Sequence, residues 1–178
     1  MRKAFGAVLI VSLIVLAACA HPPEKQITAA RNALAEAQAA EAATYAPDAL
    51  QAALAKSAAL DTQLTKRTYD KVEQLANELK KAAETAQQEA VEGKKQAQKD
   101  ANDAVNAAMD SVSNAKDAFK HISQKQYEAL KGEMQSASES LQTAENYLQN
   151  GSYIKAKQDA DKAQQAAQSI LDQIHGKK

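Results

Sequence analysis

Cys19 is the only cysteine of the chain, and its thiol is the strongest potential nucleophile that the sequence offers. It directly follows Leu16, Ala17 and Ala18, which close an apolar run that begins at Ala4. A thiol reacts as its thiolate, and a free reactive thiol near the start of an exported chain is hard to motivate unless it is modified. The position of Cys19 therefore favours covalent modification of its sulfur.

The residues before Cys19 have the organisation of an export signal. Arg2 and Lys3 form a basic segment, about a dozen apolar residues follow, and small residues close the run. The apolar run is too short to span a bilayer permanently. We therefore expect residues 1–18 to be a signal peptide.

The tetrapeptide Leu16-Ala17-Ala18-Cys19 resembles the lipobox of bacterial lipoproteins. The resemblance implies that a diacylglycerol, with palmitate-type chains, is attached to the sulfur, that the chain is cut before the cysteine, and that the new amine is acylated. Two or three acyl chains make membrane attachment effectively permanent. By the sorting rule of similar lipoproteins, Ala20 in place of Asp favours the outer membrane, with the protein on its periplasmic face. The alternative is an ordinary secreted protein with a free thiol.

The composition points to helices and excludes nucleic acid as a partner. The chain has 22 basic and 22 acidic residues and no strongly basic segment that could follow a phosphate backbone. It has two Phe, no Trp and many Ala, so a core must be thin, as in close-packed helices. The sequence predicts an all-α protein without a disulfide.

The first part of the mature chain predicts a tether and two helices. Pro22 and Pro23 favour an extended tether over residues 19–25. Helices are expected over 25–44 and 47–64, with Pro47 at the start of the second. The expected inner positions of the second helix are Leu50, Leu54, Ser57, Leu60 and Leu64.

A long helix is expected next, because small and apolar residues recur with a period of about 3.5 residues over 69–122. This seam consists of Tyr69, Val72, Ala76, Leu79, Ala83, Ala86, Ala90, Gly93, Ala97, Ala101, Ala104, Ala108, Val112, Ala115, Phe119 and Ile122. One continuous helix would be about 80 Å long at 1.5 Å per residue. A break near residues 91–95 is the alternative, because Gly93 weakens a helix.

Two more helices complete the chain. Ser123 is expected to cap the first and Gly151 to end it in a left-handed conformation, after which Ser152 caps the last helix. The inner positions are expected to be Tyr127, Leu130, Met134, Ala137, Leu141, Ala144 and Leu148, then Tyr153, Ala156, Ala160, Ala163, Ala167, Ile170 and Ile174. A weak repeat with a shift of 84 residues relates the turn before Tyr69, which Thr68 is expected to cap, to the turn before Tyr153.

The predicted architecture is an elongated antiparallel helical bundle built on one long central helix with a helical hairpin at each end. Its expected parts are the signal peptide 1–18, the lipidated tether 19–25, an N-terminal three-helix unit 26–95, and a C-terminal three-helix unit 96–178 that shares the long helix.

The N-terminal half resembles a family of alanine-rich proteobacterial envelope lipoproteins catalogued as a domain of unknown function. The likeness covers residues 19–95, and the step Tyr45-Ala46-Pro47 carries most of it. Some relatives continue into an OmpA-like peptidoglycan-binding domain. This chain stays helical and alanine-rich beyond residue 95, so the resemblance by itself does not imply that binding function.

The sequence contains no pattern typical of catalysis, metal binding or cofactor binding. His21, His121 and His175 are far apart and lack metal-ligand spacing. We therefore expect a protein that is not an enzyme and holds no metal or cofactor. The tyrosines at helix starts are expected to plug the thin core, and Tyr147 is expected to be the most exposed of the five.

The expected function is that of a non-catalytic envelope lipoprotein, a structural or interaction module whose partner is the membrane, through its lipid, and another envelope protein. Self-association is also permitted, through alanine surface near Gly93 and Ala104. A first alternative is a peptidoglycan-associated or wall-linking protein, because lipoproteins similar to Braun's lipoprotein are joined to the wall through a terminal lysine, the position of Lys178 here. A second alternative is a periplasmic adaptor or chaperone.

Overall fold

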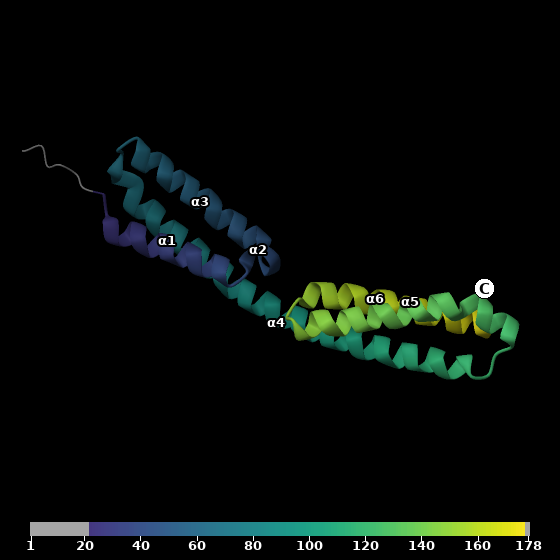
Figure 1. Ribbon diagram of the computed structural model, residues 1–178. Helices are drawn as coiled ribbons and strands as arrows, with labels where there is room; N and C mark the ends of the chain where they lie inside the picture. The colour runs from purple at the N-terminus through teal and green to yellow at the C-terminus, as the bar shows by residue number, and fades with distance from the viewer. Residues whose placement is uncertain (1–21, 177–178) are drawn as a thin grey trace, which may run out of the picture.

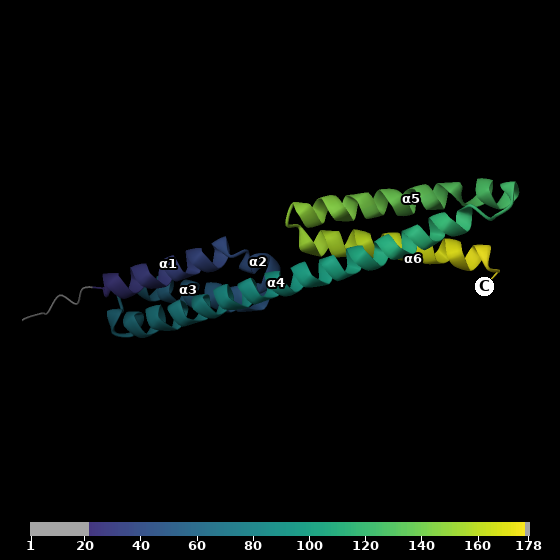
Figure 2. The same cartoon turned by 90° about the horizontal axis from the view of Figure 1, so that it is seen from below.

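The computed structural model describes residues 22–176, and this part of the chain is an elongated all-α bundle (Figures 1 and 2). The expected fold class is thereby confirmed. Its elements are α1 (Glu24–Ala39), α2 (Ala42–Tyr45), α3 (Pro47–Thr65), the 3₁₀ turn η1 (Tyr69–Lys71), α4 (Val72–Phe119), α5 (Gln124–Gln149) and α6 (Tyr153–Ile174). No described helix is apolar over a stretch long enough to cross a bilayer.

The central helix α4 is the spine of the molecule. Its 48 residues correspond to about 72 Å, and it continues through Gly93 without a break, so the broken alternative is wrong. Helices α1 and α3 pack on its first half, and α5 and α6 pack around its second half (Figure 1). The division of the chain at residues 95 and 96 into two units stays a prediction.

Both groups of helices lie on one side of α4, because the buried residues of its two halves share one face. These residues are Val72, Ala76, Leu79, Ala83, Ala86, Ala90, Ala101, Val105, Ala108, Val112 and Ala115. The step from Ala90 to Ala101 is eleven residues, close to three full helical turns, so the face keeps its direction. The α2 segment and the α5–α6 turn therefore approach each other over the middle of α4 (Figure 2).

The core is built mainly from alanine, as the composition predicted. Leu60, Leu79 and Ile170 are among the few large side chains that are completely buried, and no polar side chain of the described residues is buried. Small side chains let the helix axes approach closely, which gives many weak dispersion contacts. The molecule is therefore held together by contacts spread along its length.

The turn before Tyr69 and the turn before Tyr153 have the same backbone conformation, which confirms the 84-residue repeat. Arg67 and Gly151, which are 84 residues apart, both have left-handed backbones, with φ of 55° and 75°. In each turn the backbone amide of the following residue donates to a carbonyl in the last turn of the preceding helix. The Thr68 amide donates to the Gln63 carbonyl, and the Ser152 amide donates to the Tyr147 carbonyl. Each turn satisfies carbonyls that the ending helix would leave without donors.

Thr68, Ser123 and Ser152 all precede a helix, as expected. Only Ser123 also makes the expected capping hydrogen bond through its side chain. Ser123 and Gln126 form the reciprocal capping box that starts α5. Thr68 and Ser152 precede their helices without a capping bond from their side chains. The Thr68 hydroxyl instead contacts Gln63, in the helix before it.

The expectations about helix faces and ends are wrong in several details. The first helix ends at Ala39, not at residue 44, because Glu41 has a left-handed backbone with φ of 61°. Leu54 is 44% exposed, and Ala53 takes the inner position expected for it. In α4, Val105 is buried where Ala104 was expected, because the seam takes a step of four residues after Ala101.

Candidate interaction surfaces

The residues of the expected lipidation site lie outside the described part of the chain. Leu16, Ala17, Ala18 and Cys19 precede it, and Lys178 follows it. The described residues do fix where the two ends begin. The start of α1 and the end of α6 lie at opposite ends of the bundle (Figures 1 and 2).

The middle of the bundle, which we call the waist, depends on a very close approach of α2 to α4. A Cβ atom placed on Gly93 would lie 2.6 Å from the Tyr45 carbonyl oxygen and 3.3 Å from the Tyr45 Cβ. Only a glycine leaves room for the backbone there. The sequence predicted that Gly93 weakens the long helix. In the structure, α2 covers Gly93 and can pack this closely on α4 only because the residue is a glycine.

Two charged groups and a phenol are held together at the waist. The Lys94 ammonium donates to the Glu41 carboxylate and lies 5.9 Å from the centre of the Tyr45 ring. The bond to Glu41 raises the pKa of Lys94. Burial raises the pKa of the Tyr45 phenol, and the Glu41 charge raises it further. The left-handed Glu41 that ends α1 is therefore tied to the spine at the residue after Gly93.

Two surface hollows flank Glu41 where the two groups of helices meet. One, of about 370 Å³, lies between the end of α1 and α4 and is also lined by Tyr153. The other, of about 310 Å³, lies between α2 and the start of α6. Val91 is 58% exposed beside the first and Ile154 is 41% exposed beside the second. The waist thus presents separated apolar side chains in a polar surrounding.

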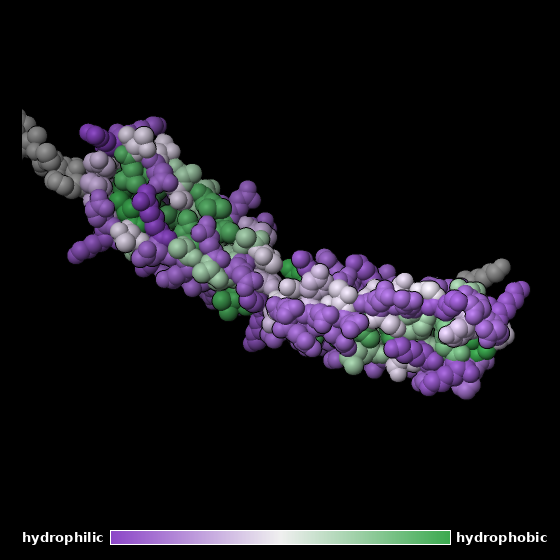
Figure 3. All heavy atoms as spheres, viewed as in Figure 1, coloured by the Kyte–Doolittle hydropathy of each residue, from purple (hydrophilic) through white to green (hydrophobic). Residues whose placement is uncertain are grey.

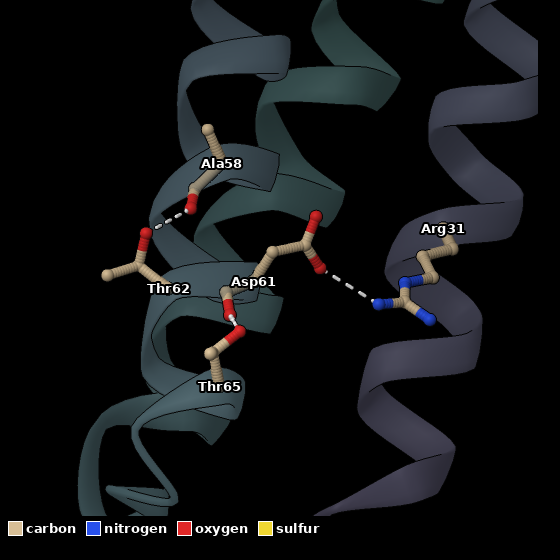
Figure 4. A network of polar contacts seen from close by, with 5 residues as sticks. All are labelled: Arg31, Ala58, Asp61, Thr62 and Thr65. Carbon is tan, nitrogen blue, oxygen red and sulfur yellow. Dashed lines mark hydrogen bonds and ion pairs between the residues drawn. The ribbon is translucent and has the colours of Figure 1, made fainter.

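Another apolar surface lies between α1 and α3. These helices each pack along α4 but touch each other little, so the side of the bundle between them is open. Arg31 of α1 reaches Asp61 of α3 across it, at 2.9 Å, with α4 behind (Figure 4). Hydrophobic residues are exposed on the part of the surface where α1 and α3 lie (Figure 3).

Helical spacing identifies the residues of this surface. Leu54 lies seven residues before Asp61, two turns along α3, so both face α1. Leu34 follows Arg31 by three residues and faces α3 in the same way. We call the surface formed by Leu34, Leu54 and Leu64 and bridged by Arg31–Asp61 the α1–α3 opening. The helical period predicted Leu54 to be inside, so this surface was not predicted from the sequence.

The two histidines of the described residues lie on the surface. His121 is exposed in the α4–α5 turn and His175 is exposed after α6. No cluster of three or more metal-ligating side chains occurs between residues 22 and 176. That the protein is not an enzyme stays a prediction.

The tyrosines follow the expectation only in part. Tyr45, Tyr69 and Tyr153 are half-buried at helix starts or turns, as expected. Tyr127 is 43% exposed and packs edge-to-face on Phe119, with the ring centres 5.7 Å apart. Tyr147, expected to be the most exposed, is half-buried, and the Lys155 ammonium lies 5.5 Å from its ring centre.

The described residues define the class of this protein as an alanine-rich helical rod of two helical groups on one continuous helix. No protein-family model, curated protein or solved structure matches the chain. Its membership of the lipoprotein family therefore stays a prediction. The motif that carries the likeness has a structural role here: Tyr45 contacts Gly93, Ala46 is buried, and Pro47 starts α3.

Proposed function

We propose that the protein is a non-catalytic lipoprotein of the bacterial envelope, anchored through acylated Cys19 to the periplasmic face of the outer membrane. The lipid anchor is supported by Leu16-Ala17-Ala18-Cys19 after an apolar run, and the role as a rod is supported by the start of α1 and the end of α6 at opposite ends of the bundle (Figure 1). A lipid near one end holds that end at the membrane, and α4 alone extends for about 72 Å. Such a rod carries its waist and its far end away from the membrane as structural or interaction surfaces.

Metabolic labelling with radioactive palmitate tests the anchor. The wild-type chain is expected to incorporate label and to fractionate with the outer membrane, whereas Cys19→Ser is expected to remain unlabelled. Ala20→Asp is the matched control, because it keeps the thiol and is expected to move the labelled protein to the inner membrane. Absence of label in the wild-type chain contradicts the proposal.

A second function, linkage to the cell wall, is supported by the same geometry. The end of α6 points away from the start of α1, so Lys178 follows the end opposite the expected lipid. Digestion of purified cell walls with muramidase is expected to release a form of the protein that carries wall fragments. Deletion of Lys178 is expected to abolish this form and Lys177→Ala to preserve it; an unchanged form after the deletion rules out the linkage.

A further inference from the structure

We propose that the α1–α3 opening shelters an acyl chain attached to Cys19 while the protein is in water. This inference rests on the proposed lipidation and assigns the opening a ligand, a saturated hydrocarbon chain of the protein's own lipid. Whenever it is outside a membrane, a lipidated protein must keep its acyl chains from water, because exposed hydrocarbon is strongly disfavoured. The opening offers apolar surface for that purpose within the same molecule.

The position of the opening relative to the chain end supports this occupant. α1 and α3 are antiparallel, so the start of α1 and the end of α3 lie at the same end of the opening (Figure 1). The five residue steps from Cys19 to Glu24 reach at most about 18 Å. Arg31 lies seven residues into α1, about 10 Å from Glu24 along the helix. A chain attached to Cys19 can therefore enter the opening from its near end and extend toward Leu54.

The chemistry of the opening also favours a hydrocarbon chain. Leu54 is 44% exposed, and Leu34 and Leu64 are half-buried against the core beneath. The two charges at the rim, Arg31 and Asp61, neutralise each other. This pair therefore adds no net charge to the apolar surface between α1 and α3.

The Arg31–Asp61 bridge limits the width of what can enter. A helix with its side chains is about 10–12 Å across, so a partner helix has to break this bridge to lie between α1 and α3. An acyl chain is much thinner and can lie against the exposed sides of Leu34, Leu54 and Leu64 without separating α1 from α3. A lipid chain therefore fits the opening without the loss of this contact, whereas a partner helix or a helix from a second copy does not.

The single cysteine allows a direct test on the mature chain, residues 19–178, which contains every described residue. Its thiol is alkylated with a maleimide that carries a hexadecyl chain ending in a solvent-sensitive fluorophore. The expected result is blue-shifted emission and several-fold weaker quenching by iodide than for the same probe on free cysteine. Both effects are expected to be independent of protein concentration, with the labelled protein monomeric in sedimentation.

Two lysine substitutions separate the opening from general surface hydrophobicity. Leu54→Lys is expected to abolish the protection of the probe, whereas Val91→Lys, at a more exposed apolar residue on α4, is expected to retain it. Circular dichroism verifies folding, and Leu54→Gln replaces Leu54→Lys if that variant unfolds. Protection that survives both Leu54 variants, or that disappears on dilution, overturns the proposal, as does an unprotected probe on the wild-type chain.

Failure of this inference is distinguishable from failure of the proposed function. Palmitate labelling in cells depends on Cys19 and the lipobox, and Leu54→Lys is expected to be labelled like the wild-type chain. A labelled protein whose attached chain is unprotected in vitro is a lipoprotein without a shelter. An unlabelled wild-type chain contradicts the anchor itself.

Discussion

Replacing Gly93 by alanine is expected to destabilise the protein, whereas the same change within a helix usually raises the free energy of unfolding. In an open helical position, Gly→Ala stabilises by about 1 kcal/mol, because glycine loses more backbone entropy on folding. At Gly93 the new Cβ would lie 2.6 Å from a backbone oxygen of Tyr45 and 3.3 Å from its Cβ. The backbone of α2 must then move away from α4.

The size of the effect follows from two opposing contributions. Inserting a methyl group into a filled site costs typically about 1–3 kcal/mol, which exceeds or matches the gain of about 1 kcal/mol in helix propensity. The contact is to backbone, so no side-chain rotation can relieve it. We therefore expect Gly93→Ala to lower the free energy of unfolding by about 0–2 kcal/mol.

Gly132 supplies a matched control. It lies in α5, is exposed, and a Cβ built on it has no neighbour within 4 Å. Gly132→Ala is expected to raise the free energy of unfolding by about 1 kcal/mol. The two alanine variants should therefore differ by about 1–3 kcal/mol, although each makes the same change within a helix.

Urea denaturation followed by circular dichroism at the helix band measures this difference. Native-state hydrogen exchange localises it, because the amides of α2 and the turn to Pro47 are expected to exchange faster in Gly93→Ala and unchanged in Gly132→Ala. If Gly93→Ala stabilises the protein as much as Gly132→Ala does, α2 does not pack tightly on the spine, and the account given for the waist is wrong.

Three further predictions concern single side chains. Arg67→Gly is expected to stabilise the protein by about 1 kcal/mol in thermal unfolding, because glycine adopts the left-handed backbone without strain, and Arg67→Ala is not expected to do so. Leu60→Ala, at a completely buried position, is expected to cost about 2–5 kcal/mol in urea denaturation, and Leu54→Ala, at a 44% exposed position, less than half of that; equal losses contradict the orientation of α3. The hydrogen bond from Lys56 lowers the pKa of Glu78, so its carboxylate favours the folded state above its ordinary pKa and this contribution is lost as pH falls through the lowered value. A carboxyl titration by NMR should show the Glu78 pKa rising in Lys56→Met.

The helices and their order follow from the sequence because they depend on local properties. Alanine content, the 3.5-residue period and the residues at helix ends act within one or two turns of the chain. Pro47 at the start of α3, Gly151 at the end of α5 and the capping box of Ser123 and Gln126 are all of this kind. Continuity of α4 through Gly93 also follows, because the seam keeps its phase there.

The two candidate surfaces depend on how far apart the helices stand, which no local pattern determines. The helical period predicts that Leu54 and Leu60 lie on the same face of α3. It does not predict how much of that face the neighbouring helices cover. Because α1 and α3 do not close on each other, the edge that bears Leu54 remains open. Glu41 ends α1 with a backbone that favours glycine, and its contact with Lys94 joins positions 53 residues apart.

Composition, helical period and helix-end residues are enough to predict an all-α chain of antiparallel helices on one long helix, and the residues before Cys19 are the reason to expect a lipid there. The folded molecule adds that both helical groups lie on one side of α4, that Gly93 must stay a glycine, and that apolar surface remains between α1 and α3. Helix formation is decided by neighbours along the chain, whereas the distance between two packed helices is decided by whichever side chains from remote segments meet.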